Sequence, residues 1–398
     1  MNLTGDLFLA LLILLTIGAF TGVILLWRRL SGRNWRAVLG RVGVLGGAQL
    51  MVVVLVAALA NDYFGFYGSW HDLFGFATQT QSVFQNPDQV GTRGRGTGTA
   101  LGAGGTVGRQ LLSVQSISGL NLPSGTAPAV TGQTQNVTIQ GAVTGLSTQA
   151  IVYFPPQYFQ QAYQDYRFPV AIISTGYPGD LQALENRLKY PYRLLTGLNG
   201  HTDRPVVLVM TQPSPTSVGG TDTECTNVPG GPQVNTFWAQ DIPTALEQAY
   251  PRLATDARSW GLMGDSTGGD CALKVSMMNS DRFGVAVSLS GDYNAPEDIT
   301  TGNLYQNQQF RDENNVMWRL RNLAKPPIAV LLASSLTGEN DISAVQEFVR
   351  LTRGTPLRTS TLLRNEGGHN FATWNAEIAP ALQWLTNTLT SPTPLPRV

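Results

Sequence analysis

The chain of 398 residues carries 26 lysine and arginine residues against 26 acidic residues, so its formal net charge at pH 7 is zero. Charged residues make up 13% of the sequence, about half the share that is usual in soluble globular proteins. This balance offers no basic surface for phosphates, so we expect no nucleic-acid partner. The length allows one large α/β domain with attached segments.

Two long apolar runs, residues 7–26 and 42–60, lie near the start of the chain and contain no charged residue. Each is long enough, at about 1.5 Å per residue, to cross the roughly 30 Å hydrocarbon layer of a membrane. We therefore expect two transmembrane helices in a membrane anchor at residues 1–62. A cleaved signal peptide is the alternative for the first run, but it requires a basic start, and residues 1–6 contain no lysine or arginine.

The loop between the two runs predicts the orientation of this anchor. It contains no acid and five arginines, namely Arg28, Arg29, Arg33, Arg36 and Arg41. By the positive-inside rule, an arginine-rich loop of this kind is cytoplasmic. Both termini and the large outer domain are then extracytoplasmic, and the two spans contact membrane lipids.

Residues 63–112 are expected to connect the anchor to the outer domain at residues 113–398. Their first part is rich in aromatic residues, which favour the lipid headgroup boundary but also suit a helix packed on the domain. Residues 91–108 contain eight glycines and no aromatic residue, a composition typical of a flexible tether.

Short β-rich runs alternate with helix-like segments in the outer domain. Runs at 136–140 and 150–154 predict an antiparallel pair. Later runs are continuous and apolar, as expected for strands covered on both faces: 170–174, 206–210, 260–263, 285–289 and 328–333. Residues 359–363 are also strand-like. Helices are expected at 181–198, 242–250, 269–279, 344–350 and 374–389. This alternation predicts a mostly parallel sheet with helices on both sides and ligands at the carboxyl ends of its strands.

The sequence Gly264-Asp265-Ser266-Thr267-Gly268 follows one predicted strand and precedes a predicted helix. It fits the G-x-S-x-G pattern, in which glycines allow a turn too tight for side chains beside a strained, exposed serine. The pattern alone is weak, but strand, turn and helix are the context it requires. We therefore predict that Ser266 is a nucleophile; an ordinary serine in a glycine-rich turn is the alternative.

A serine hydroxyl needs a base to take its proton, and on this fold the base follows the nucleophile in the chain. The sequence contains three histidines, His71, His201 and His369. His71 lies near the membrane spans and His201 precedes Ser266, whereas His369 follows a predicted strand. His369 is therefore the predicted base.

The base in turn needs an acid that fixes its tautomer. Asp341 lies in the loop after the strand at 328–333 and is the preferred candidate. Glu339, two residues earlier, and Glu347, on the next predicted helix, remain alternatives.

Acyl transfer also needs two backbone N–H groups aimed at the developing oxyanion. One is expected from Thr267, directly after the nucleophile. The other is expected from the loop after the strand at 170–174, where Pro178 has no N–H and Tyr177 is the predicted donor.

Cys225 and Cys271 lie on the side of the membrane that the topology makes oxidising, so we expect a disulfide, with two free thiols as the alternative. The bridge would stabilise the fold by roughly 4 kcal/mol on the loop-entropy model. The sequence has no H-E-x-x-H pattern and no paired cysteine ligands, so no metal and no cofactor are expected.

Taken together, these residues resemble the actinobacterial esterase D and mycolyltransferase branch of the α/β-hydrolases. The resemblance covers residues 136–389 and rests on the Ser266 turn together with segments 236–243, 288–291, 347–350 and 367–370. It implies extracytoplasmic ester hydrolysis or acyl transfer through an acyl-serine. The triad acid of the esterase members matches Asp341, and that of the mycolyltransferases matches Glu347. Asp265 and Thr267 depart from the apolar residue and the methionine that the family commonly has beside the nucleophile.

We therefore expect a membrane-anchored, extracytoplasmic serine esterase or acyltransferase that acts on a lipid or acyl-sugar ester of the cell envelope. Water as the acceptor makes an esterase, and a sugar or lipid hydroxyl makes a transferase. The alternative is a non-catalytic α/β-hydrolase-fold subunit that docks in a membrane or envelope complex, motivated by Asp265 and the two additional spans.

Overall fold

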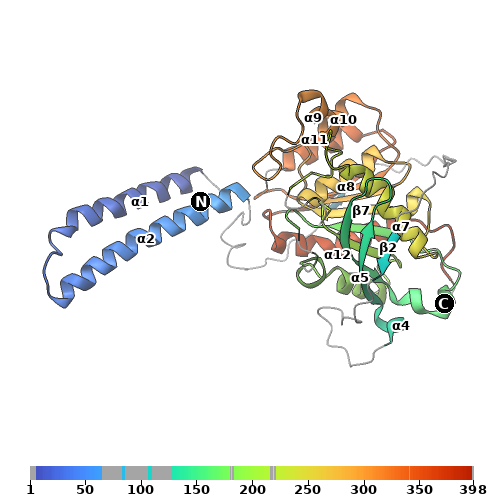
Figure 1. Ribbon diagram of the computed structural model, residues 1–398, viewed down its shortest axis with the longest axis horizontal. Coiled ribbons are helices and arrows are strands. Elements are labelled where there is room, and N and C mark those ends of the chain that lie inside the picture. The colour runs from blue at the N-terminus through green and yellow to red at the C-terminus, as the bar shows by residue number, and fades with distance from the viewer. Residues whose placement is uncertain are drawn as a thin grey trace. The chain divides into compact units, whose positions relative to one another are not determined.

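A computed structural model of the chain describes residues 6–64, 83–85, 106–109, 127–179, 181, 183–215, 218, 221–339 and 341–396 (Figure 1). The chain divides into two compact units. One holds the N-terminal helices together with Ser335–Glu339 and Asn365–Thr373, and the other holds Ser82–Ser334, Asn340–Arg364 and Trp374–Val398.

The N-terminal region forms two long helices, α1 (Asp6–Trp27) and α2 (Trp35–Phe64), which pack against each other (Figure 1). By length and composition, Phe8–Trp27 and Trp35–Ala60 could each cross a membrane. Helix α2 begins before the predicted run because Asn34 accepts a hydrogen bond from the Ala37 amide at 2.9 Å, which caps the helix there.

One ten-stranded sheet runs through the described part of the second unit, with the order β1-β10-β9-β8-β7-β5-β6-β4-β3-β2. Its strands are β1 (Val83–Gln85), β2 (Thr106–Arg109), β3 (Gln133–Gln140), β4 (Ser147–Phe154), β5 (Val170–Ser174), β6 (Val207–Thr211), β7 (Trp260–Asp265), β8 (Val285–Leu289), β9 (Ala329–Ser335) and β10 (Arg358–Arg364). All the strands predicted from apolar runs are present. Strands β1 and β2 come from the segment expected to connect anchor and domain, whose other described residues belong to the end of α2.

The central strands are parallel, whereas the margins of the sheet are antiparallel. Strands β6, β5, β7, β8 and β9 pair in parallel, and β2, β3 and β4 pair antiparallel beyond β6. The Arg358 amide donates to the Ile328 carbonyl at 2.9 Å, so β10 starts at the same edge as β9. The loops after β5, β7, β8, β9 and β10 therefore all leave from the carboxyl edge.

The strand order reverses at β5. The chain passes from β5 to β6 on one side and returns to β7 on the other, so the loops after β5 and β7 diverge from neighbouring strands. Ligands of open α/β sheets bind at such a switch point.

Helices cover both faces of the sheet. The longer ones are α5 (Tyr190–Asn199), α7 (Ile242–Ala249), α8 (Thr267–Met278), α11 (Ile342–Thr352) and α12 (Phe371–Thr388). Shorter helices and turns are α4 (Pro128–Thr131), η1 (Pro156–Phe159), η2 (Gln161–Tyr163), η3 (Ala183–Arg187), α6 (Val234–Thr236), η5 (Phe237–Asp241), η6 (Ala257–Ser259), α9 (Gln308–Asn314) and α10 (Val316–Asn322).

The buried faces of β7 show how the layers are built. Leu262 belongs to a core that includes Leu246 of α7 and Val275 of α8. Its neighbour Gly261 faces the other layer, where an added Cβ would lie 3.1 Å from Leu385 of α12. Because successive residues of a strand point to opposite faces, α7 and α8 cover one face and α12 covers the other.

The helix predicted at 181–198 is instead two elements, η3 and α5. Lys189 has a φ of 57°, outside the helical region, and Pro191 follows at the start of α5. A proline is favoured in the first helical turn but lacks the N–H that a continuous helix would use, so the chain begins a new helix here.

Helices α9 and α10 were not expected from the sequence, although each begins with a cap. The Asn307 side chain accepts from the Phe310 amide at 2.9 Å, and the Asn315 side chain accepts from the Trp318 amide at 2.8 Å. Asparagine three residues before these amides is the local signal that could have located both helices.

Candidate active site

Ser266 lies in a sharp turn between the end of β7 and the start of α8. Its backbone has a φ of 55° and a ψ of −127°, a conformation that non-glycine residues rarely adopt. The Ser266 amide donates to the Leu289 carbonyl of β8 at 3.0 Å, and its own carbonyl accepts from the Asp270 amide at 3.1 Å. These bonds hold the turn in a strained geometry, as the nucleophile prediction requires.

The glycines on either side of Ser266 have no room for a side chain. A Cβ added to Gly264 would lie 2.5 Å from the Gly268 carbonyl oxygen, and one added to Gly268 would lie 2.6 Å from the Ser174 carbonyl oxygen. Both obstacles are backbone atoms, which cannot move away by a change of rotamer. The glycines of the motif therefore allow the close approach of β5, β7 and α8.

The loop after β5 lies directly against the serine. A Cβ added to Gly176 would lie 2.8 Å from the Ser266 Cβ and 3.1 Å from its Oγ. Tyr177, the predicted oxyanion donor, is the next residue along this loop. Thr267, the other predicted donor, opens α8, and the first N–H groups of a helix have no acceptor within the helix. The structure thus brings Ser266, Thr267 and the loop that carries Tyr177 together.

Asp265 is completely buried beside Ser266. Its Oδ2 accepts the Thr175 hydroxyl at 3.0 Å and the Gly176 amide at 3.1 Å. Burial raises the pKa of Asp265 to about 7, although these two hydrogen bonds oppose the shift. The carboxylate that departs from the family pattern therefore contacts the loop after β5.

Asp341 follows β9 and is held by one strong hydrogen bond. The Ser334 hydroxyl donates to its Oδ1 at 2.7 Å, whereas its Oδ2 is buried and has no hydrogen-bond partner among the described residues. Burial raises the pKa of Asp341 to about 6, the Ser334 bond lowers it, and the charge of Asp292 raises it further. One oxygen of Asp341 could therefore accept a hydrogen bond from another group.

The two alternative acids have other partners. Glu339 is buried and accepts the Ser335 hydroxyl at 2.8 Å. Glu347 forms two hydrogen bonds of 2.6 Å with Arg350 on the surface of α11, and these bonds lower the pKa of Glu347. The described contacts of Glu347 are those of a solvated helix ion pair.

His369 lies in the loop between β10 and α12. The Gly368 amide beside it donates to the Thr373 hydroxyl at 2.8 Å, and the Asn370 side chain accepts the Thr373 amide at 3.0 Å, which caps α12. Within the same compact unit, the Gly367 amide donates to the Thr337 carbonyl in the loop after β9 at 3.1 Å. The pairing of His369 with Ser266 stays a prediction.

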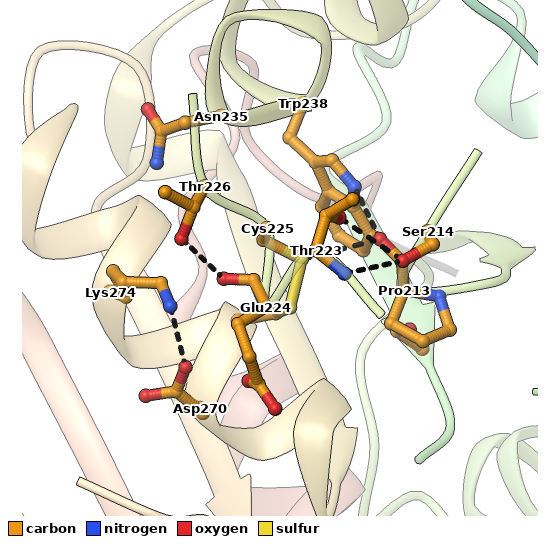
Figure 2. The surroundings of a disulfide bond; sticks show 12 residues. Pro213, Ser214, Thr223, Glu224, Cys225, Thr226, Asn235, Trp238, Asp270 and Lys274 are labelled. Atoms are coloured by element: carbon orange, nitrogen blue, oxygen red, sulfur yellow. Dashed lines mark hydrogen bonds and ion pairs between the residues drawn. A yellow bond between two sulfur atoms is a disulfide. The ribbon is translucent and has the colours of Figure 1, made fainter. Parts of the chain in front are cut away.

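The predicted disulfide is present between Cys225 and Cys271, with a Cα–Cα distance of 5.5 Å (Figure 2). Cys271 lies on α8, five residues after Ser266. The bridge therefore ties α8, the helix that follows Ser266, to the loop at residues 221–228, and the alternative of two free thiols is excluded.

A buried ion pair beside this bridge was not found from the sequence. Lys274 donates to Asp270, one turn before it on α8, at 2.8 Å. Figure 2 shows the Glu224 side chain beside this pair. Burial raises the pKa of Glu224 well above its usual range. Burial lowers the pKa of Lys274, but the interactions with Asp270, Tyr305 and Glu224 together more than offset this and the net shift is upward. A lysine four residues after an aspartate on a helix is the only sequence signal, and it usually marks an exposed pair.

No group of three or more histidine, cysteine, aspartate or glutamate side chains is placed to hold a metal ion within the part of the chain that the structure describes. The groups that the structure brings together at the end of β7 are the Ser266 hydroxyl, the Asp265 carboxylate and the backbone of the loop after β5.

Comparisons with known proteins bear on the family and the fold. The model of the Esterase family, described as "Putative esterase", matches residues 141–385. The chain is 26% identical over 165 residues to the uncharacterized protein Cgl0967/cg1104 of Corynebacterium glutamicum, an alignment that covers 38% of each chain. The chain thus spans less than two fifths of the length of this curated relative.

Two solved structures establish the fold. An S-formylglutathione hydrolase from Agrobacterium tumefaciens superposes with a TM-score of 0.54 at 15% identity, covering 67% of this chain and 98% of the other. A ferulic acid esterase superposes with a TM-score of 0.50 at 16% identity, covering 65% of this chain and 98% of the other. The predicted α/β-hydrolase fold with a mostly parallel central sheet is confirmed.

Proposed function

Because the chain belongs to the esterase family, we propose that it is a serine hydrolase that cleaves a carboxylic ester through an acyl-serine intermediate. Ser266 is the nucleophile, His369 the base, Asp341 the acid that orients His369, and the amides of Tyr177 and Thr267 bind the oxyanion. The observation that carries the proposal is the strained Ser266 turn with the loop after β5 packed against its Oγ.

In the proposed reaction, His369 takes the proton of Ser266 while the Ser266 oxygen attacks the carbonyl carbon of the ester. The carbonyl oxygen becomes an oxyanion held by the two amides. His369 then gives its proton to the departing alcohol, which leaves the acyl group on Ser266. A second alcohol or water repeats these steps in reverse and frees the serine.

A side-chain contact joins α12 to the carboxyl edge of the sheet. Trp374, five residues after His369, donates its ring N–H to the Ser290 hydroxyl at 3.1 Å. Ser290 directly follows β8, the strand beside β7. Asp341 has a buried Oδ2 with no hydrogen-bond partner among the described residues, so this oxygen is open to accept the imidazole N–H that a triad requires.

The decisive experiment is labelling by a serine-directed fluorophosphonate. The full chain in detergent should be labelled, and Ser266→Ala should not be. A folded native chain that takes no label would favour the second candidate, a non-catalytic subunit that docks in a membrane or envelope complex. Asp265, a carboxylate next to the nucleophile, is the observation that motivates this candidate.

We place the enzyme at the extracytoplasmic face of the cell membrane, held by α1 and α2 with the arginine-rich loop in the cytoplasm. Its substrate would then be a lipid or acyl-sugar ester of the cell envelope, with water or an envelope hydroxyl as acceptor, as the resemblance to the mycolyltransferase branch implies. Protease added outside intact cells should degrade the outer domain; its protection would contradict this topology.

A further inference from the structure

Asp265 lies directly before the nucleophile and has no exposure to solvent. Ionisation of its carboxyl group there carries a large desolvation cost. The cost of burying a carboxylate is offset only where hydrogen bonds satisfy its oxygens. Both described hydrogen bonds to Asp265 come from neighbouring residues of one loop, Thr175 and Gly176. That loop is the one whose Gly176 lies against the Ser266 Oγ.

These contacts join the loop after β5 to the end of β7 through a single atom. The Oδ2 of Asp265 accepts a hydroxyl from Thr175 and an amide from Gly176, so it restrains two successive residues at once. Because the Gly176 amide already donates to Asp265, the oxyanion has to be bound by another group of the loop. Accurate placement of this loop matters, because a shift of about 1 Å at a reacting centre can lower a rate about 100-fold.

We infer that Asp265 is a positioning residue, which holds the Thr175–Gly176 segment against Ser266 and so fixes the oxyanion-binding loop. This inference rests on the proposed serine hydrolase function. Asp265 does not touch the substrate; it acts through the loop. The role belongs to its acceptor oxygen rather than to its charge, since one oxygen makes both bonds.

A second carboxylate in the molecule anchors a loop in the same way and provides a matched control. Asp241 is buried and accepts the Val143 amide at 2.8 Å, the Thr144 amide at 3.1 Å and the Thr144 hydroxyl at 2.6 Å. It restrains the loop between β3 and β4, and β4 lies three strands from β7 in the sheet order. Removal of Asp241 should therefore loosen a loop that takes no part in the reaction.

The test compares Asp265→Leu, Asp265→Asn and Asp241→Leu in the full chain in detergent, with p-nitrophenyl butyrate as the probe ester. Rates are expressed per active site titrated to completion with fluorophosphonate. Asp265→Leu should lower kcat about 10- to 100-fold and change KM less than about three-fold, because the loop acts on the transition state. Asp265→Asn keeps an acceptor oxygen and should retain kcat within about three-fold of the native value. Asp241→Leu should leave kcat unchanged.

Native kcat in Asp265→Leu would overturn the inference, as would an equal loss of kcat in Asp241→Leu, or a loss in Asp265→Asn as large as in Asp265→Leu. Absence of both turnover and labelling in the native chain would instead contradict the proposed function itself.

If Asp265→Leu fails to fold, the kcat of Thr175→Val tests the same inference. It removes one of the two bonds and should lower kcat about three- to ten-fold, with KM nearly unchanged. In the Asp265→Asn background the same substitution should have the same effect, since the amide oxygen keeps both bonds. A native kcat in Thr175→Val would contradict the inference.

Discussion

The loop after β7 and the loop after β9 leave the same edge of the sheet but are built in opposite ways. Ser266, after β7, is held by backbone hydrogen bonds, by glycines without space for a Cβ and by strained dihedral angles. Asp341, after β9, is held by one hydroxyl, and its second oxygen is buried without a described partner. The difference shows that Ser266, the proposed nucleophile, is fixed by the backbone, whereas Asp341, the proposed acid, keeps one oxygen open to a further donor.

The largest expected effect distinguishes Asp341 from Glu347 as the acid of the triad. Asp341→Asn should lower kcat about 10⁴-fold, because the base loses the carboxylate that fixes its tautomer. Glu347→Gln, the matched control on α11, should retain kcat within about two-fold, since it alters a surface ion pair. Ester hydrolysis by the purified full chain measures both. Full activity of Asp341→Asn with loss in Glu347→Gln would transfer the acid role to Glu347.

A smaller effect tests the close packing at the nucleophile. Gly176→Ala places a methyl group 2.8 Å from the Ser266 Cβ, so either the loop or the serine has to shift. We expect kcat to fall about 100-fold while the thermal midpoint changes little, since the strain is confined to one loop. Gly46→Ala in α2 is the control, because an added Cβ there meets no atom within 4 Å. Native kcat in Gly176→Ala would show that the loop withdraws without functional consequence.

The smallest expected effect concerns the charge of Asp265. Its pKa is raised from 3.8 to about 7 in the folded protein, so the folded state binds the proton more tightly than the unfolded state between these values. The contribution of Asp265 to the free energy of unfolding therefore falls as pH rises from about 4 to 7 and is constant above pH 7.

Thermal unfolding of the native chain and of Asp265→Asn measures this linkage. The melting temperature of the variant should rise relative to that of the native chain between pH 5 and pH 8, and the two should differ by a constant amount between pH 8 and pH 9. A difference independent of pH over the whole range would mean that Asp265 is already ionised at pH 5.

Much of the fold follows from patterns that depend on neighbours in the sequence. The apolar runs at 170–174 and 285–289 coincide with β5 and β8, because strands buried on both faces must be apolar throughout. The serine turn was predictable for a similar reason, since the glycines that it needs are themselves part of the motif.

Features that depend on contacts far apart in the chain were not predictable. From the sequence, Asp265 stands out only as a departure from the family pattern, because its partners lie in a loop some ninety positions earlier. Lys274 and Asp270 have the spacing of a surface pair, and only the packing of α8 shows that they are buried. Strands β1 and β2 are too short to give a periodic signal, and β2 in addition lies in a glycine-rich segment.

The bond between Gly176 and Asp265 also bears on how the molecule acquires its chemistry during folding. It joins residues 89 positions apart, so the loop after β5 meets the nucleophile only once β5 and β7 have come together. Helices such as α8 can form from local interactions before that event. Covalent capture of the serine by a reactive phosphonate would then report tertiary closure of the sheet, and during refolding it should be regained after the helical circular dichroism signal.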